Sequence, residues 1–172
     1  IDNDIEVRGG YQFNEVGVTN FEDVSNPDFT SLVKEIVRTH AIFGETERYS
    51  KSHNTYIRLG ARISYFEKLK ELVLEPRFAF NQKISDHIRL EVLGELKSQT
   101  ISQVIDLQQD FFGIEKRRWQ LSNLESVPLV KSQQISLGLS YNQNNLFVSL
   151  EGYYKNVEGI TAQSQGFQNQ FQ

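Results

Sequence analysis

The chain of 172 residues carries a formal net charge of −4, and hydrophobic residues make up 38% of it. The acidic balance disfavours a nucleic-acid-binding protein, which is usually basic, and the lack of cysteine excludes disulfides and thiolate chemistry. No run approaches the ~18 consecutive apolar residues of a transmembrane helix.

The first predicted strands are Ile5–Val18 and Ile36–Tyr49, with Thr19–Glu35 between them as a long loop. The strand predicted at Thr55–Tyr65 is more regular, because apolar residues occupy every second position and Arg58 alternates with them. Successive side chains of a strand point to opposite faces, so this pattern indicates one apolar and one charged face.

The same alternation predicts two more strands at Leu72–Phe80 and His87–Lys97. If Phe80 pairs near Ile88 across the intervening turn, Arg77 lies opposite Glu91 as an attractive cross-strand pair.

The last predicted strands are Gln134–Tyr141 and Asn145–Val157, which follow a long loop at 101–130. Beyond Val157 the polar, Gln-rich sequence resembles the start of another surface loop. The prediction is therefore seven strands. Barrels formed by one bacterial chain use even strand numbers, so we expect further strands outside these residues.

The length of the strands and the distribution of short and long connections favour a membrane barrel. The clear strands carry roughly nine to eleven alternating residues, enough for a tilted strand to cross a bilayer, whereas soluble strands average about five or six. Short polar turns at Ser50–Asn54, Gln82–Asp86 and Asn142–Asn145 fall at one end. The long loops fall at the other end, together with one tight connection around Glu67–Glu71. The predicted fold is all-β, an antiparallel meander of about seven long strands forming a sector of a transmembrane β-barrel.

Three segments resemble the barrel of TonB-dependent outer-membrane receptors. The run Leu74–Leu90 contains Glu-Pro-Arg and an Ile-Ser-Asp turn before a return strand. Lys131–Leu139 is similar to a strand of that family with the pattern Lys-x-x-x-(apolar)-x-Leu-Gly, and Leu150–Val157 to its Glu-x-Tyr-Tyr-Lys partner.

This resemblance implies a barrel of roughly 22 strands around an N-terminal plug, in the bacterial outer membrane. Residues 1–172 would form part of the barrel, with the plug domain and the remaining strands outside them. The implied activity is TonB-dependent uptake of a large scarce nutrient: a siderophore, a vitamin or an oligosaccharide. The implied partners are outer-membrane lipid, the plug, the TonB complex and the transported ligand.

On this interpretation the charged stripes face the barrel lumen and the apolar stripes face lipid. The predicted lumen-facing residues are Arg58, Arg62, Glu75, Arg77, Arg89, Glu91, Glu95, Glu151 and Lys155, with Lys97 beside them. The predicted lipid-facing residues are Ile57, Leu59, Leu74, Leu90, Val92, Leu137, Leu139, Val148 and Leu150. The alternative is a solvated sheet face whose ion pairs contribute little.

The long loop 101–130 contains a mixture of aromatic residues and cations that suits ligand recognition. The candidate ligand-binding residues are Phe111, Phe112, Arg117, Arg118 and Trp119. The alternative is a loop that packs these aromatic rings against the barrel rim.

The sequence predicts no enzyme activity, cofactor or metal site. The histidines His40, His53 and His87 lack metal-ligand spacing. Glu75 and Glu91 could serve as an acid–base pair, but the neighbouring arginines favour ion pairing.

Two other functions fit the same pattern. One is a small, complete outer-membrane barrel acting as an anchor or adhesin, and the other is a soluble β-sandwich that binds carbohydrate. In the sandwich the apolar stripes would meet a second sheet about 10 Å away.

Overall fold

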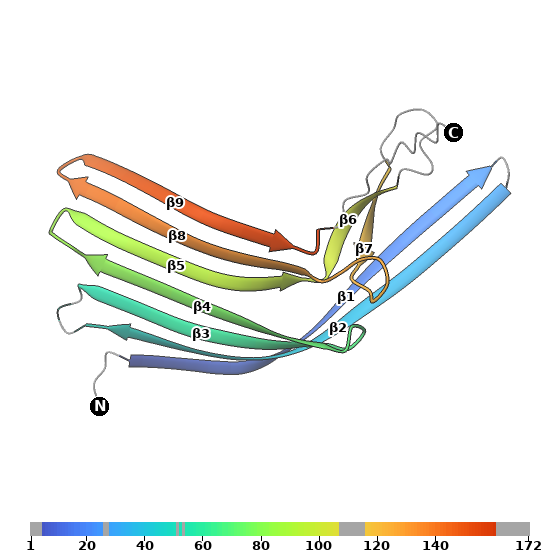
Figure 1. The fold of residues 1–172 in the computed structure, drawn as a ribbon, viewed down its shortest axis with the longest axis horizontal. Helices are drawn as coiled ribbons and strands as arrows, with labels where there is room; N and C mark the ends of the chain where they lie inside the picture. Colours follow the sequence, from blue (N-terminus) through green and yellow to red (C-terminus); the bar gives the residue numbers. More distant parts are fainter. Residues whose placement is uncertain (1–4, 26–27, 51, 53, 107–115, 161–172) are drawn as a thin grey trace, which may run out of the picture.

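The computed structural model describes residues 5–25, 28–50, 52, 54–106 and 116–160, which form strands, turns and bends without a helix among them. Seven strands form one antiparallel sheet in the order β1-β2-β3-β4-β5-β8-β9, and β6 and β7 form a separate hairpin (Figure 1). The strands are β1 (Ile5–Ser25), β2 (Asp28–Tyr49), β3 (Thr55–Phe66), β4 (Glu71–Lys83), β5 (Ile88–Gln99), β6 (Ile101–Asp106), β7 (Lys116–Leu121), β8 (Val130–Gln143) and β9 (Leu146–Glu158).

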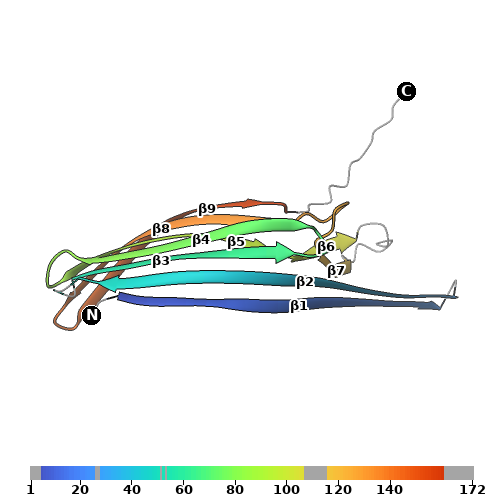
Figure 2. The same cartoon turned by 90° about the horizontal axis from the view of Figure 1, so that it is seen from below.

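The seven-stranded sheet is a curled half-barrel, seen face-on in Figure 1 and edge-on in Figure 2. This confirms the predicted all-β meander. Consecutive strands pair except at β5 and β8, where the β6–β7 hairpin intervenes. The short turns β2–β3, β4–β5 and β8–β9 lie at one end of the sheet, whereas the long β1–β2 and β6–β7 excursions and the tight β3–β4 turn lie at the other (Figure 1).

The predicted loop at Thr19–Glu35 is wrong, because these residues extend β1 and β2 into a long hairpin. Pairing continues without interruption from Asn14↔Thr39 to Ser25↔Asp28, while β3 ends opposite Thr39. We call residues 15–25 and 28–38 the arm. Cross-strand pairs such as Phe21↔Leu32 support it, but many of its alternating positions are polar, which weakens the hydrophobic period in the sequence.

The predicted loop 101–130 is also partly wrong, since it contains the β6–β7 hairpin with Ile101 paired to Leu121. This hairpin contributes to a small apolar core, because Leu121 is fully buried against Val37 and Phe66. The core lies at the end of the sheet where β3 turns into β4, and its remaining buried members are Leu69 and Leu129.

The register between β4 and β5 differs from the predicted one. Phe80 pairs with Val92, so Arg77 lies opposite Glu95 rather than Glu91. The reason is that β4 continues past Phe80 to Lys83, where the turn closes through a hydrogen bond from Ile84 N to Ile88 O of 2.9 Å. Because β4 is longer than predicted, each of its residues pairs with a β5 residue that lies further along β5 than predicted.

Candidate functional site

The sheet has a polar face and an apolar face, and the register assigns each residue to one of them. The polar face carries the even-numbered residues of β1, β3 and β8 and the odd-numbered residues of β2, β4, β5 and β9. All nine residues predicted to face the lumen lie on this polar face, and all nine predicted to face lipid lie on the apolar face. Leu90, Leu139 and Leu150, for example, form one row across three strands.

Burial is the reverse of that in a soluble sheet. On the polar face Glu75 is 5% exposed and Ser64 and Ser136 are also buried, whereas on the apolar face Leu137 is 56% and Leu150 is 74% exposed. Side chains on the inside of a curved sheet converge and shield one another. The burial pattern therefore identifies the polar face as the concave one.

Ion pairs connect the strands across the polar face. Arg58 Nη2 lies 2.8 Å from Glu45 Oε2, and Arg8 Nη1 lies 3.6 Å from Glu45 Oε1 and 3.3 Å from Glu47 Oε1. The guanidinium groups of Arg8 in β1 and Arg58 in β3 thus both pair with carboxylates of β2, which lies between them. This arrangement cross-links β1, β2 and β3 through side chains on the polar face.

Glu75 has the densest set of partners on this face. Its carboxylate accepts hydrogen bonds from Ser64 Oγ (2.9 Å), Ser98 N (2.7 Å) and Ser98 Oγ (2.8 Å), and Arg62 Nε lies 3.4 Å away. The β4–β5 ladder ends at Arg77↔Glu95, and the next residue, Pro76, has no N–H to continue it. The Glu75 side chain bridges the two strands where the backbone no longer does.

Arg77 lies in the middle of the polar face. Among the hollows that it lines are two of about 320 and 290 Å³, the first shared with Glu95 and Glu151 and the second with Arg8 and Arg62. Within the described residues the Arg77 guanidinium makes no ion pair. The hollows could accept hydroxyl, carboxylate or phosphate groups of a solute, for which arginine is well suited.

The predicted ligand loop is only partly observed. Phe111 and Phe112 lie outside the described residues, as does the side chain of Arg117, while Arg118 and Trp119 belong to β7 and not to a loop. Their strand runs beside the arm, because Asn20 Nδ2 donates a hydrogen bond of 3.1 Å to the carbonyl oxygen of Trp119. Arg118 Nη1 lies 3.9 Å from Glu22 Oε2 on the same arm.

His40 participates in a polar chain that the sequence did not reveal. Its Nδ1 lies 2.7 Å from the Tyr11 hydroxyl, and its Nε2 lies 2.7 Å from Glu67 Oε1. Three distant segments supply these groups, so no local spacing could have indicated the contact. These three hydrogen-bonded side chains lie at the end of the apolar face from which the arm departs. In a membrane barrel, interfacial side chains are expected at such an end.

No group of three or more potential metal-ligating residues occurs in the described part of the chain. His87 Nδ1 lies 3.2 Å from the Asn142 carbonyl oxygen, and His53 lies outside the described residues. Glu75 is engaged by Arg62, while Glu91 lies opposite Asn81 and Gly138, so the two carboxylates do not form an isolated pair.

The aromatic residues near strand ends divide between the faces. Tyr65, Phe80, Tyr141 and Tyr154 lie on the apolar face, whereas Phe66 and Tyr153 lie on the polar face. Only the first group could contribute to an aromatic girdle.

No family model matches the sequence, and no curated protein matches it either. Among the described residues there is no helix long and apolar enough to cross a membrane.

Proposed function

We propose that this chain is a wall sector of an outer-membrane β-barrel, with its apolar face against lipid and its polar face lining a wet interior. The observation that carries the proposal is the inverted burial, in which Glu75 is buried on the concave face and Leu150 is exposed on the convex face. In water the convex face would be unfavourable, since soluble proteins rarely expose apolar patches above a few hundred Å².

The soluble sandwich requires a second layer over the apolar face. None of the described residues forms such a layer: β6 and β7 pack with the arm, and the small apolar core draws its sheet residues Val37 and Phe66 from the polar face. The exposed stripe of Leu59, Leu137 and Leu150 therefore favours lipid as its environment.

The curvature favours a wide barrel over a small complete one. Seven strands of an eight-stranded barrel would almost close, bringing β1 and β9 within one strand of each other. Instead β1 and β9 lie at opposite edges of an open sheet in both views (Figures 1 and 2). A wide barrel has room for a plug and a large solute.

The finer proposal is a TonB-dependent receptor that imports a large scarce nutrient. It is supported by the resemblance of Leu74–Leu90 and Lys131–Leu139 to that family and by the wide curvature. The charged hollows around Arg77 would hydrate the pathway and hold polar groups of the plug or solute.

Membrane embedding is tested at two adjacent residues of β9. Leu150 and Glu151 are both exposed but lie on opposite faces, and the chain contains no cysteine to interfere with labelling. Nitroxides on Leu150→Cys and Glu151→Cys are compared in vesicles by electron paramagnetic resonance. We expect oxygen, which concentrates in lipid, to relax the label at 150, and a water-soluble nickel chelate to relax the label at 151. Equal access of the nickel chelate to both labels would contradict the proposal.

Receptor activity is tested by deleting the gene in its bacterium and measuring growth when iron, a vitamin or a polysaccharide is limiting. If the protein is such a receptor, the deletion strain should grow poorly on one nutrient class, and the restored gene should repair that growth. Inactivation of TonB in the complemented strain should abolish the repair. Complementation that is independent of TonB would contradict the finer proposal while leaving the barrel in place.

A further inference from the structure

A trough crosses the apolar face at the level of Gly94. Direct register pairs place one residue from each of five strands in a single row, running Leu59, Phe78, Gly94, Ile135 and Tyr154. The trough has a volume of about 490 Å³, within the range of small-molecule sites, roughly 300–1,000 Å³.

Two local features create the trough. Gly94 has no side chain, and the Phe78 ring lies over it so closely that an added Cβ would overlap the ring. Beside it Pro76 ends the β4–β5 ladder, and the strands diverge. Leu96 and Pro76 line the space left between them.

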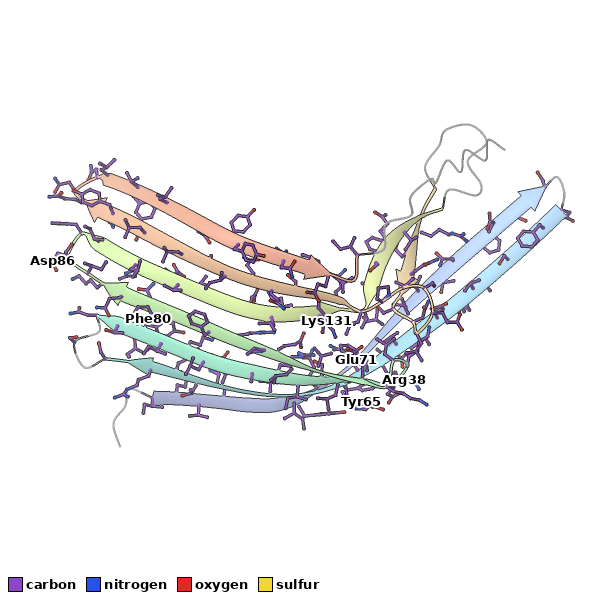
Figure 3. All side chains as sticks on the ribbon, viewed as in Figure 1. Arg38, Tyr65, Glu71, Phe80, Asp86 and Lys131 are labelled. Carbon is purple, nitrogen blue, oxygen red and sulfur yellow. The ribbon has the colours of Figure 1, made fainter. Side chains whose placement is uncertain are left out.

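The trough has a polar end. A second hollow of about 250 Å³ shares Leu96 and Gln133 with it and reaches Lys131. Lys131 Nζ lies 2.6 Å from Glu71 Oε1, a pair that joins β8 to β4 across the diverging strands (Figure 3). Apolar walls therefore lead to a half-exposed ion pair at the strand ends from which the arm leaves.

We propose that this trough binds one acyl chain of a bilayer lipid, with the polar headgroup beside Lys131 and Glu71. The inference rests on the proposed function, which places the apolar face in the membrane. A depression in that face must be filled, and water is a poor occupant because the walls offer it few polar partners. The trough is continuous with the lipid-facing surface, so an acyl chain enters without crossing a polar barrier.

A chain in the trough is held more firmly than lipid on the flat face. Phe78, Leu96 and Tyr154 contact it from several sides, and many weak dispersion contacts add up when a ligand is enclosed. The phosphate of a lipid headgroup can pair with Lys131, which lies on the apolar face. Phosphatidylethanolamine carries such a phosphate together with acyl chains and serves as the probe.

The test is native mass spectrometry of the intact protein after reconstitution in phosphatidylethanolamine vesicles and washing in detergent. We expect the wild type to retain one phospholipid. Ile135→Trp fills the trough and should lower the occupancy by about tenfold, whereas Leu137→Trp, two residues along β8 on the same face, should leave it unchanged. Leu59→Trp with Ile57→Trp as its control repeats the comparison on β3.

A reference measurement separates this inference from the proposed function. In a Trp119→Phe background, brominated lipid chains should quench the fluorescence of Leu137→Trp. Quenching together with unchanged lipid retention in both trough variants would overturn the acyl-chain site alone. Absence of quenching would overturn the membrane proposal and the site with it.

Discussion

Glu75 occupies a position where a carboxylate is both buried and fully engaged. It joins β3, β4 and β5 through Ser64, Arg62 and Ser98 at the point where Pro76 interrupts the backbone ladder. Removing the carboxylate takes away the acceptor of the buried Ser64 hydroxyl and of the partly buried Ser98 donors, which costs stability.

We therefore expect Glu75→Ala to lower the free energy of unfolding by about 3 kcal/mol, the scale for breaking a buried pair. Glu151→Ala is the control, because Glu151 is exposed on the same face and makes no ion pair among the described residues. It should change stability by less than about 0.5 kcal/mol. Urea unfolding of the membrane-reconstituted protein measures both, and equal effects would contradict the bridging role of Glu75.

Asp86 illustrates an exposed turn residue with a directional pKa shift. Lys83 Nζ donates a 2.7 Å hydrogen bond to its Oδ1, and this bond together with the ammonium charge lowers the pKa of Asp86. The folded state is favoured while Asp86 is ionised, so this contribution is present above the ordinary pKa of about 3.9 and is lost as the pH falls through the lowered value.

Replacing Lys83 by Gln should raise the pKa of Asp86 toward its ordinary value, as followed by a carboxyl-carbon NMR titration. Lys68→Gln is the control because Lys68 pairs with Glu35 at the opposite end of the sheet. An unchanged Asp86 titration in the Lys83 variant would show that the turn contact is not maintained in solution.

At the scale of elements, the arm and the β6–β7 hairpin support each other. Leu121 from β7 is fully buried against Val37 of β2 and Phe66 of β3, and the Asn20 side chain bonds to the β7 backbone. The arm extends 11 residues per strand past β3, or about 36 Å at ~3.3 Å per residue. A two-stranded ribbon of that length is marginal by itself, so its base needs this core.

Leu121→Ala should destabilise the arm base by about 2–5 kcal/mol, as expected for a buried leucine. Leu124→Ala should have little effect because Leu124 is 75% exposed. Limited proteolysis measures the local opening: cleavage within the arm should accelerate in the first variant only. Identical cleavage of both variants would show that the arm is stable without the core.

At the scale of the whole molecule, the ends of the sheet should lie on opposite sides of the membrane. Ser52 belongs to a short turn, and Leu124 follows β7 at the opposite end. Short turns are periplasmic in outer-membrane barrels, and long excursions are extracellular.

In intact cells we expect a membrane-impermeant maleimide to label Leu124→Cys and to spare Ser52→Cys. Permeabilised cells, in which both sites should react, provide the control for reactivity. Labelling of Ser52→Cys alone would reverse the proposed orientation, and labelling of both in intact cells would contradict a membrane-spanning arrangement.

The sequence by itself determined which side chains share a face. Arg58, Glu75 and Leu137 could be assigned correctly because the period of two in a strand is a local property that needs no partner. The seven sheet strands and the short turns at one end followed from the same pattern, since runs of alternation are bounded by polar turn residues.

Only the tertiary structure decided the register, the arm and the contacts between distant segments. Arg77 meets Glu95 because β4 runs on to Lys83, and His40 meets Glu67 because β2 and β3 pair. The concave position of the polar face also depends on the curl of the sheet as a whole. Register and curvature arise from hydrogen bonds and packing between remote strands, so the alternation within one strand cannot specify them.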